Sequence, residues 1–331
     1  MTNEKKRLIV IDSNSVIHRA FHALPALSRK NGELVNAVYG FLLVFLKAVK
    51  DFQPDFIVAA FDYPAPTFRS KIYKQYKAKR PPAPQELYQQ IPKVKEFLKA
   101  FGVSFFEKEG FEADDIIGTI ARSAPKKQVL PKIETIILSG DLDTLQLVDD
   151  NTKIYALRKG VKDVVLYDEN SVREKFGGLG PEQILDFKAL RGDPSDNIPG
   201  VTGIGEKTAI SLLLKFGSLE NIYKEIEKNS VRTRELKPKL KEVLLKYKEQ
   251  AFLSKELAKI EKNVPIDFNL IKCSWQGLDK KKAKELLEKF EFTSLLKRLP
   301  EIEREREMKI TQSSPSANAS EKQIGENLRL W

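Results

Sequence analysis

The residues best suited to chemistry in this chain are nine carboxylates, which fall in five short clusters. Most clusters stand where a predicted strand ends or a predicted helix begins. Carboxylates that meet in one pocket repel one another and need a cation, and hard divalent ions take oxygen ligands. The sequence therefore predicts a divalent-metal centre that contains Asp12, Asp62, Glu112, Asp114, Asp115, Asp141, Asp143, Asp193 and Asp196.

The rest of the chain is strongly basic. Its 331 residues include 57 Lys and Arg against 46 Asp and Glu, which gives a net charge of +11. This excess favours a polyanionic partner, either nucleic acid or an acidic membrane surface. A basic surface around an acidic, metal-filled centre is the charge distribution needed to cut a phosphodiester bond.

Several protein classes are excluded by composition. Cys273 is the only cysteine, so we expect neither a disulfide framework nor a thiolate zinc cluster. The apolar run at the N-terminus stops at Asp12, which predicts no signal peptide. The most apolar stretch, 37–49, is too short to span a bilayer. We therefore expect a cytoplasmic protein without a membrane partner.

Three apolar runs rich in Ile and Val are expected to position the first acids. Such runs suit strands buried on both faces of a parallel sheet, and they lie at 7–12, 56–62 and 133–141. Each run closes on an aspartate, and ligands of open α/β sheets bind outside the carboxyl ends of the strands. We therefore expect Asp12, Asp62 and Asp141 to converge.

Helical patterns separate these runs. They cover 34–51, 85–101 and 113–124. Strands that alternate with helices predict an α/β fold with a mostly parallel sheet. After about Ser171 strand patterns nearly vanish, and the predicted helices are 181–191, 206–216, 219–228, 237–247, 250–259 and 281–290. We therefore predict an α/β core at 1–175, a helical region at 176–300, and a polar tail or linker at 301–331.

Each acid cluster has a simpler alternative role. The acids at 112–115 open a helix, where carboxylates cap the backbone and favour the positive end of the helix dipole. Asp141 and Asp143 could start a turn, and Asp12 and Asp62 could be strand-end turn residues. The metal interpretation is favoured because five separate clusters would otherwise fall at one sheet edge by chance.

The segment 63–85 carries six Lys or Arg and no acid. Arg69, Tyr73, Tyr76 and Arg80 are spaced by 4, 3 and 4, which predicts one face of a helix. A solvated basic helix is the alternative. Aromatic rings between cations favour single-stranded nucleic acid, since bases stack on rings while cations follow phosphates. A flexible basic arch over the metal site is the resulting hypothesis.

A glycine-rich stretch, GVTGIGEKTA at 200–209, joins two predicted helices. Backbone N–H groups that lead into a helix N-terminus, with Lys207 in the first turn, can hold a phosphate without reading bases. A tight glycine turn would explain Gly203 and Gly205 but not Lys207. Near the N-terminus, His18 and His22 lie at i, i+4, but packing or surface roles are favoured over zinc binding. Arg19, between them, is the better candidate for a phosphate contact.

Taken together, these stretches resemble the 5′ nuclease domain of bacterial DNA polymerase I, within the flap endonuclease superfamily. The resemblance covers roughly 6–299, in order and without a large gap. It is carried by LIVIDSNSVIHRAFHALP, FDYPAPTFRSKIYKQYKAKRPPAP, GFEADDIIGTIAR, SGDLDTLQLV and ALRGDPSDNIPGVTGIGEKTA. Ordered motifs of this length are more specific than any single short pattern.

The resemblance implies a PIN-like 5′ nuclease fold with a helical arch at about 63–85 and a duplex-binding helix–three-turn–helix element at about 181–216. It also implies cleavage of DNA at 5′ flaps and 5′ ends with two Mg²⁺ or Mn²⁺ ions, in primer removal and repair. The first ion would be bound by Asp12, Asp62, Glu112 and Asp114. The second would be served by Asp115, Asp141, Asp143, Asp193 and Asp196.

Further roles follow from the same resemblance. Tyr76, Lys77 and Arg80 would grip and polarise the scissile phosphate. Arg69 would support them, and Arg19 and Tyr73 would also contact DNA. The duplex clamp, often with a K⁺ ion, would comprise Gly200, Gly203, Gly205, Lys207 and Thr208. We expect a monomer located with the nucleoid, either a stand-alone nuclease or a fragment linked to a polymerase.

The mechanism expected from this resemblance uses two ions about 4 Å apart, with in-line attack on phosphorus. Two alternatives remain open at this point. One is a catalytically inactive module of the same fold that binds branched DNA, and the other is a PIN-like ribonuclease. The helical half at 181–216 argues against the second alternative, because such ribonucleases usually lack it.

Overall fold

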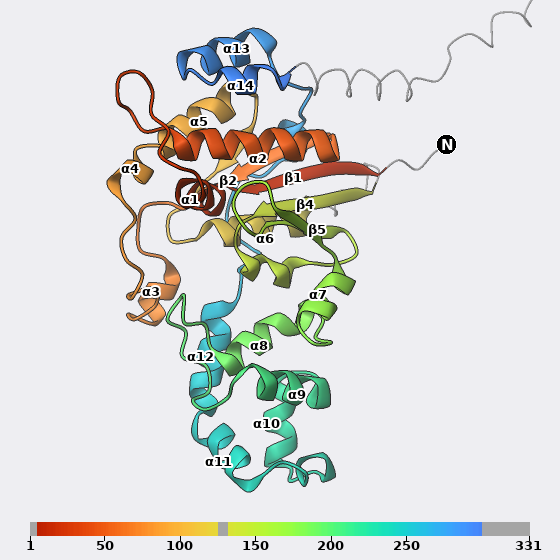
Figure 1. The fold of residues 1–331 in the computed structure, drawn as a ribbon. Helices are drawn as coiled ribbons and strands as arrows, with labels where there is room; N and C mark the ends of the chain where they lie inside the picture. The colour runs from red at the N-terminus through yellow and green to blue at the C-terminus, as the bar shows by residue number, and fades with distance from the viewer. Residues whose placement is uncertain (1–4, 125–131, 300–331) are drawn as a thin grey trace, which may run out of the picture.

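Five of the six strands of a single sheet run parallel, in a computed structural model that describes residues 5–124 and 132–299 (Figure 1). The strand order is β3-β2-β1-β4-β5-β6, and β6 runs antiparallel to β5. The strands are β1 (Lys6–Asp12), β2 (Phe56–Ala60), β3 (Ser104–Phe106), β4 (Ile133–Ser139), β5 (Thr152–Leu157) and β6 (Val164–Tyr167). The predicted α/β class is confirmed, and the predicted tail at 301–331 lies outside the described residues.

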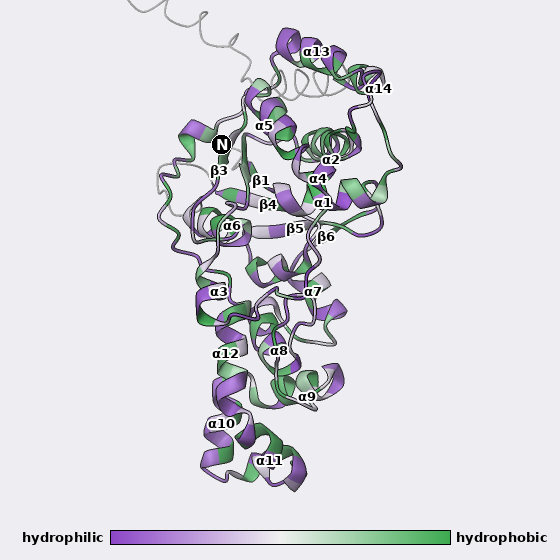
Figure 2. Ribbon diagram, turned by 90° about the vertical axis from the view of Figure 1, so that its left-hand side faces the viewer, coloured by the Kyte–Doolittle hydropathy of each residue, from purple (hydrophilic) through white to green (hydrophobic). Residues whose placement is uncertain are grey.

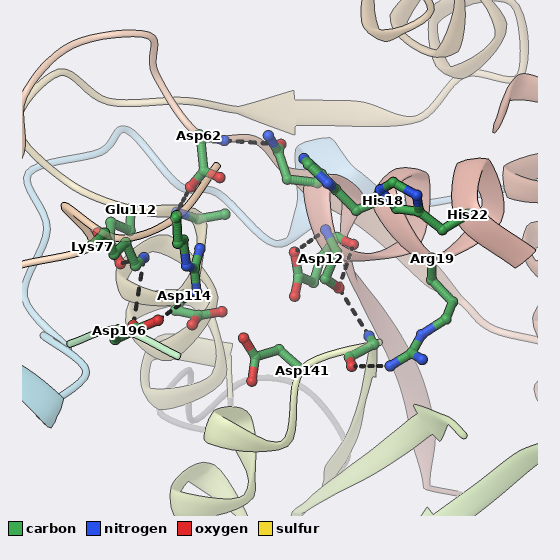
Figure 3. A pocket seen from close by; sticks show the side chains of 15 residues that line it. Asp12, His18, Arg19, His22, Asp62, Lys77, Glu112, Asp114, Asp141 and Asp196 are labelled. Carbon is green, nitrogen blue, oxygen red and sulfur yellow. Dashed lines mark hydrogen bonds and ion pairs between the residues drawn. The ribbon is translucent and has the colours of Figure 1, made fainter. Parts of the chain in front are cut away.

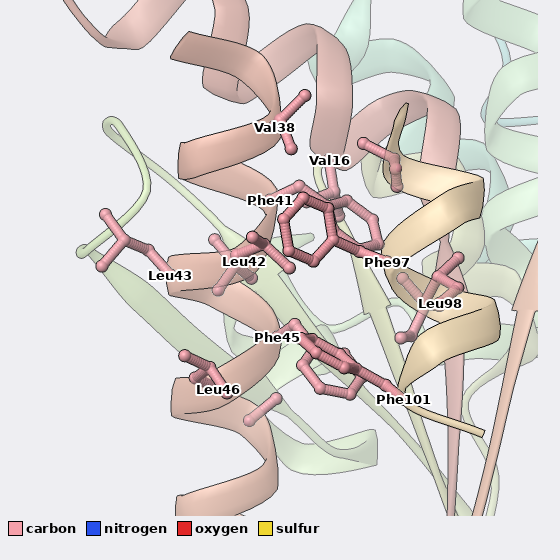
Figure 4. Close-up of a cluster of buried hydrophobic side chains, with 14 of the residues drawn as sticks. Val16, Val38, Phe41, Leu42, Leu43, Phe45, Leu46, Phe97, Leu98 and Phe101 are labelled. Atoms are coloured by element: carbon pink, nitrogen blue, oxygen red, sulfur yellow. The ribbon is translucent and has the colours of Figure 1, made fainter. Parts of the chain in front are cut away.

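Two hydrophobic cores lie on opposite faces of the sheet, because successive residues of a strand point to opposite sides. In β1, Ile9 and Ile11 face α1, α2 and α5, while Leu8 and Val10 face α6. Figure 4 shows the first core, where phenylalanines of α2 and α5 interleave. Figure 2 shows hydrophobic residues gathered on α2, which is buried between the sheet and α5. Double-sided burial explains why the central strands read as continuous apolar runs.

Helices connect the strands, and after β6 the described chain contains helices without further strands. Those of the α/β unit are α1 (Ser13–Ala23), α2 (Asn36–Phe52), α3 (Phe68–Ile72), α4 (Gln85–Tyr88), α5 (Ile91–Ala100), α6 (Ala113–Ser123), the 3-10 helix η2 (Leu142–Leu147) and α7 (Glu169–Lys175). Those that follow are η3 (Pro181–Gln183), α8 (Ile184–Arg191), α9 (Glu206–Phe216), α10 (Leu219–Glu227), η4 (Val231–Thr233), α11 (Pro238–Lys246), α12 (Lys248–Ala258), η5 (Ile271–Cys273), α13 (Lys280–Lys289) and α14 (Thr293–Leu296).

The helices α8 to α12 form a second unit below the sheet in Figure 1, with a hydrophobic core of its own. The chain then returns to the first unit. The prediction had placed all of 176–300 in one helical region. Ile260 and Leu270 pack on one face of the sheet, and Trp275 and Leu287 pack on the other. The α/β unit is therefore completed by residues from both ends of the described chain.

The segment 63–85 also differs from its prediction. The helix α3 covers only Phe68–Ile72, and turns follow it up to Arg80. Tyr73 ends α3 in an extended conformation with φ −138°, and Lys77 has a φ of 55°. The predicted helix from Arg69 to Arg80, with four side chains on one face, is therefore wrong.

Tertiary packing explains this departure from helical spacing. Tyr76 is buried in a small hydrophobic cluster with Ile198 and Leu257, against which Tyr73 packs. The backbone N–H of Lys77 donates to the carbonyl of Asp196 at 2.9 Å, which ties the turns to the loop after α8. Burial of these side chains outweighs local helix propensity, which is a weak determinant in short segments.

No helix among residues 5–124 and 132–299 is both long and apolar enough to cross a membrane.

Candidate metal centre

A cavity of about 380 Å³ opens at the carboxyl ends of β1, β2 and β4 (Figure 3). Six of the nine predicted metal ligands line this cavity: Asp12, Asp62, Glu112, Asp114, Asp141 and Asp196. They reach it from the ends of the three strands, from the start of α6 and from the loop after α8. The expected convergence of Asp12, Asp62 and Asp141 is thus observed. Asp115, Asp143 and Asp193 lie outside the lining.

Asp12 is fixed in place by serines. It ends β1 and caps α1, where its Oδ1 accepts the Ser15 N–H at 3.1 Å. The hydroxyl of Ser139, the last residue of β4, donates to Asp12 Oδ2 at 2.6 Å. The same hydroxyl accepts the Asp141 N–H at 2.9 Å. One serine at the end of β4 therefore fixes the positions of two cavity acids relative to each other.

Asp62 and Asp114 meet at the start of α6. The side chain of Asp62 accepts the Ala113 N–H at 2.8 Å, which attaches the end of β2 to the first turn of the helix. The Asp62 N–H in turn donates to the side chain of Asn14 at 3.1 Å. Asp114, in that first turn, lines the cavity with Asp62. The local fold thus presents acids from two elements to one space.

The electrostatics of these acids favour a bound cation. Burial, partly offset by hydrogen bonds from Ser139 and Ser15, raises the pKa of Asp12 to about 6. Desolvation also raises the pKa of Asp62. Burial together with repulsion from Asp12, Asp141 and Asp143 raises the pKa of Asp114 well above its usual value. Carboxylates whose charged forms are disfavoured in this way are stabilised by a nearby positive ion.

In chemistry the donor set fits Mg²⁺ or Mn²⁺, since all six ligand candidates offer carboxylate oxygen. The positions of these side chains, however, do not yet form a coordination site. Within the part of the chain that the structure describes, no three His, Cys, Asp or Glu side chains form a ready-made group that could hold a metal ion. Cationic side chains engage several of these acids instead.

Lys77 and Arg80, from the turns after α3, line one side of the cavity, and Tyr76 from the same turns contacts two of its acids. Lys77 Nζ lies 2.8 Å from Glu112 Oε2 and 3.7 Å from Asp196 Oδ2. Arg80 pairs with Asp196. The Tyr76 hydroxyl lies 3.1 Å from Glu112 Oε2 and 3.2 Å from Asp196 Oδ2, to which it donates. The segment 63–85 therefore brings its charges to the acids although it is not the predicted helix.

The ionisation of these side chains is set by the same contacts. Burial alone would lower the pKa of Lys77, but Glu112 and Asp196 raise it above its usual value. Burial and then the neighbouring carboxylates raise the pKa of Tyr76, which remains a neutral hydroxyl. Arg80 keeps about half of its side chain, 47%, exposed. Both cations are thus positioned to reach an anion that enters the cavity.

Arg69 and Asp115 form a buried pair outside the lining of the cavity, next to Glu112, whose Oε2 lies 3.7 Å from Arg69. Arg69 donates to both oxygens of Asp115 at 2.8 and 2.7 Å, and the two side chains expose 3% and 0% of their surface. Arg69 also donates to the carbonyls of Leu257 and Lys259. The predicted DNA contact of Arg69 conflicts with this burial, and Asp115 faces a guanidinium where a second ion was predicted.

Asp143 and Asp193, also predicted for the second ion, are bridged by Lys188. This lysine lies on α8, and its Nζ is paired with Asp143 and lies 2.8 Å from Asp193 Oδ2. The Asp193 Oδ1 atom accepts the Ser195 N–H at 2.9 Å and the Ser195 hydroxyl at 2.6 Å. The sequence analysis missed Lys188, although a lysine within the apolar run ILDFKAL was a signal that could have found it.

The histidines set aside in the sequence analysis also line the cavity. His18, Arg19 and His22 lie on the face of α1 opposite Asp114 and Asp196 (Figure 3). Arg19 donates to the Gly140 carbonyl at 3.1 Å. Burial and then His22 and Arg80 lower the pKa of His18, which favours its neutral ring. Their i, i+4 spacing was visible in the sequence, but the cavity they face was not.

The glycine-rich loop before α9 divides into two parts. Gly200 is buried, its N–H donates to Ser254 Oγ at 3.0 Å, and its carbonyl accepts from Gln250. The predicted contact of Gly200 with DNA therefore conflicts with its use inside the protein. Gly203, Gly205 and Lys207 are exposed, with Gly205 at the N-cap of α9.

Beside this loop, Lys207 and Thr208 line a groove of about 230 Å³ on the surface of α9. The exposed part of the loop and the start of the helix are thus accessible from solvent, and their contact with DNA stays a prediction.

Comparison with protein families gives two matches that together cover most of the described chain. Residues 7–177 match the 5′-3′ exonuclease, N-terminal resolvase-like domain. Residues 179–281 match the 5′-3′ exonuclease, C-terminal SAM fold.

Curated relatives agree with these matches. DNA polymerase I of Bacillus subtilis is 44% identical over 304 residues, which are 92% of this chain and 33% of that polymerase. DNA polymerase I of Caldicellulosiruptor bescii is 41% identical over 297 residues, or 88% of this chain and 33% of that polymerase. The chain thus spans about one third of the length of the curated relatives it matches.

Solved structures share the fold. The T5 5′-exonuclease with divalent zinc ions aligns with a TM-score of 0.62 at 20% identity, covering 86% of this chain and 99% of that one. The catalytic core of Rad2 in complex with DNA substrate aligns with a TM-score of 0.56 at 20% identity, covering 87% and 88%.

Proposed function

Since this chain belongs to the 5′-3′ exonuclease family and is a 5′ nuclease, we propose that it hydrolyses DNA phosphodiesters at 5′ flaps and 5′ ends with two Mg²⁺ or Mn²⁺ ions. The observation that carries the proposal is the meeting of six carboxylates at the carboxyl ends of β1, β2 and β4, beside Lys77 and Arg80. An acidic centre with a cationic margin suits a phosphodiester, whose charge the ions and the cations share.

The roles of the acids follow from their placement. The ions would be held by the six acids of the cavity, Asp12, Asp62, Glu112, Asp114, Asp141 and Asp196. Asp143 and Asp193 would serve the second ion from outside the lining, and Asp115 would anchor Arg69 instead. When bound, the ions supply activation of water near neutral pH and neutralisation of charge on phosphorus and the leaving oxygen. Ser139 keeps Asp12 and Asp141 in register for this task.

The basic side chains would exchange partners when DNA binds. Lys77 and Arg80 now pair with Glu112 and Asp196. When metal ions bind these carboxylates, the two cations would pair with the scissile phosphate instead. Tyr76 is buried and contacts Glu112 and Asp196, so it would act on the same phosphate through these two acids. These side chains bind and orient the phosphate, and they stabilise the charge that develops during in-line attack.

The helical unit would hold the duplex on one side of the cut. Gly203, Gly205, Lys207 and Thr208 would contact the phosphate backbone through N–H groups and charge at the start of α9. A K⁺ ion at this loop is part of the proposal. Arg19 and Tyr73 would contact DNA nearer to the cavity. Since phosphate contacts dominate, affinity should fall steeply with salt.

The cellular role is proposed from the relatives. Because the polymerases match over one third of their length, we propose that the chain removes primers and flaps during replication and repair, in covalent or functional association with a DNA polymerase. It would act as a monomer on chromosomal DNA in the cytoplasm.

Cleavage of a labelled flap tests the proposal. A 5′-end-labelled 5′-flap DNA should be cut in Mg²⁺ and left intact in EDTA. Release of the whole flap would indicate endonuclease action, and release of short pieces would indicate end trimming. Asp141→Asn should lower the cleavage rate at least 100-fold and leave DNA affinity nearly unchanged, since the loss falls on transition-state charge.

The outcome also separates the alternatives. Tight binding of branched DNA without cleavage in Mg²⁺ or Mn²⁺ would favour the inactive binding module. Faster cleavage of an RNA flap than of a DNA flap of equal sequence would favour the ribonuclease. Cutting of DNA by Asp141→Asn at the normal rate would contradict the assignment of the acids.

A further inference from the structure

Lys188 is a largely buried cation near the proposed metal centre that the proposed reaction does not use. Its side chain exposes 11% of its surface, against 28% for Lys77 and 47% for Arg80. It projects from α8 of the helical unit to Asp143, which lies in η2 of the α/β unit, and to Asp193, which follows α8. A single ammonium therefore joins two acids from separate units.

The Lys188 ammonium partly neutralises the charge of these two acids. Asp193 shares its two oxygens between Lys188 and Ser195. Burial would raise the pKa of Asp193, but Lys188 and these hydrogen bonds lower it to about 2. Burial and the adjacent Asp141 raise the pKa of Asp143 to about 7 even though Lys188 opposes them. The ammonium is thus paired with both acids at once.

The position of this bridge matters because Asp143 is directly connected to the cavity. The Asp143 N–H donates to Asp141 Oδ1 at 2.9 Å, and Asp141 lines the cavity. A divalent ion that recruits Asp143 or Asp193 must take a carboxylate from Lys188. Two cations on this half-buried pair of carboxylates would repel each other.

We propose that Lys188 competes with the second divalent ion for Asp143 and Asp193, so that this ion binds weakly until the ammonium is displaced. The proposal rests on the metal-dependent function proposed above. It makes Lys188 a positioning residue that sets ion affinity, and it couples ion entry to the contact between α8 and η2. The phosphates of bound DNA would then serve as the new counter-ions of the displaced ammonium.

Manganese binding to the full chain without DNA tests this competition. The concentration of free Mn²⁺ is followed by electron paramagnetic resonance for the wild type, Lys188→Met, Lys188→Arg and Lys255→Met. Lys255 is a matched control, because its ammonium also bridges two acids, Asp186 and Glu220, but within the helical unit.

Removal of the competing charge should tighten the weaker Mn²⁺ site about tenfold in Lys188→Met. Lys188→Arg retains the charge and should bind Mn²⁺ like the wild type, and so should Lys255→Met. In EDTA, Lys188→Met should also have a lower midpoint of thermal unfolding, because two half-buried carboxylates lose their partner. Addition of Mn²⁺ should raise the unfolding midpoint of Lys188→Met by more than it raises that of the wild type.

A second measurement needs no variant. Acylation of lysines by acetic anhydride, read by mass spectrometry, should increase at Lys188 when Mn²⁺ is added, because a displaced ammonium becomes accessible. Acylation at Lys255 should not change. This arm keeps the proposal testable if Lys188→Met does not fold.

The outcomes separate the two proposals. Unchanged or weaker Mn²⁺ binding by Lys188→Met, or constant acylation of Lys188, would show a purely structural bridge and overturn the competition. Absence of Mn²⁺ binding by the wild type at millimolar concentrations would instead contradict the proposed metal-dependent function.

Discussion

At the scale of single residues, the cavity gathers carboxylates that oppose one another's ionisation. Asp12 shows this best, because burial raises its pKa to about 6 while serines still donate to both of its oxygens. Its folded-state pKa lies above that of an unfolded aspartate. Stability is therefore lost as the pH rises through about 6, and regained as the pH falls towards 4.

Asp12→Asn should accordingly stabilise the protein in EDTA at pH 7.5, by roughly 1–3 kcal/mol. The gain should shrink as the pH is lowered towards 4, because Asp12 is then protonated in both states. Urea unfolding at several pH values measures this. Asp267→Asn, at an exposed carboxylate, is the control. An equal effect of Asp12→Asn at pH 4 and pH 7.5 would contradict the assigned cause.

The sequence was sufficient to predict much of this site. Asp12, Asp62 and Asp141 follow buried strands, and parallel strands place their carboxyl ends at one edge. It was not sufficient for partners that depend on packing between units. Nothing in the spacing of Asp143 and Asp193 shows that Lys188 stands between them, or that Asp115 would face Arg69.

At the scale of elements, α3 is held by one buried ion pair. Arg69 connects α3 to Asp115 of α6 and to the carbonyls that end α12. Arg69→Met should cost about 3–5 kcal/mol, since it leaves a buried carboxylate without its partner. Urea unfolding measures this cost. Arg80→Met, at a half-exposed arginine, should cost less than about 1 kcal/mol.

DNA affinity distinguishes the two roles considered for Arg69. Folded Arg69→Met should bind flap DNA nearly as well as the wild type, whereas Arg80→Met should bind it more weakly. Full stability of Arg69→Met with weak DNA binding would restore the contact predicted from the sequence.

The turn between α8 and α9 gives a matched pair of glycines. Gly200 has a φ of +63°, and a Cβ there would lie 2.2 Å from the Gly192 nitrogen. Gly203 has a φ of +87° with nothing within 4 Å of the added atom. Gly203→Ala should therefore cost about 1–2 kcal/mol of conformational strain, and Gly200→Ala should cost clearly more.

Thermal unfolding of the two glycine variants measures this difference. Equal losses would show that the backbone conformation alone matters and that the close approach to Gly192 can relax. Either glycine was predictable as a turn residue, but only the fold shows that Gly200 is required by a neighbouring chain segment while Gly203 faces solvent.

At the scale of the whole molecule, the chain leaves the sheet for the helical unit and then returns to complete both hydrophobic cores. This return was not predicted, because helix α13 reads as a charged surface helix, with three lysines in its first turn. Its apolar positions Ala283, Leu286 and Leu287 are nevertheless buried on the core that contains α2 and α5. Periodicity predicted the helix, but not the unit on which it packs.

Substitution of Trp275 tests how much the returning segment contributes to the stability of the protein. It exposes 3% of its surface, its Nε1 donates to the Phe101 carbonyl at 3.0 Å, and its backbone N–H donates to Asp55 next to β2. Trp275→Ala removes a large buried side chain and leaves the Phe101 carbonyl without this donor. The expected loss is about 3–5 kcal/mol of unfolding free energy.

Urea unfolding with far-ultraviolet circular dichroism measures that loss, and Leu245→Ala in the exposed part of α11 is the control. Since Trp275 lies beside the sheet that positions Asp12 and Asp62, destabilisation should also lower Mn²⁺ affinity at temperatures near the midpoint of unfolding. A Trp275→Ala protein as stable as the wild type would mean that residues 260–299 are an appendage. The α/β unit would then correspond to the core predicted at 1–175.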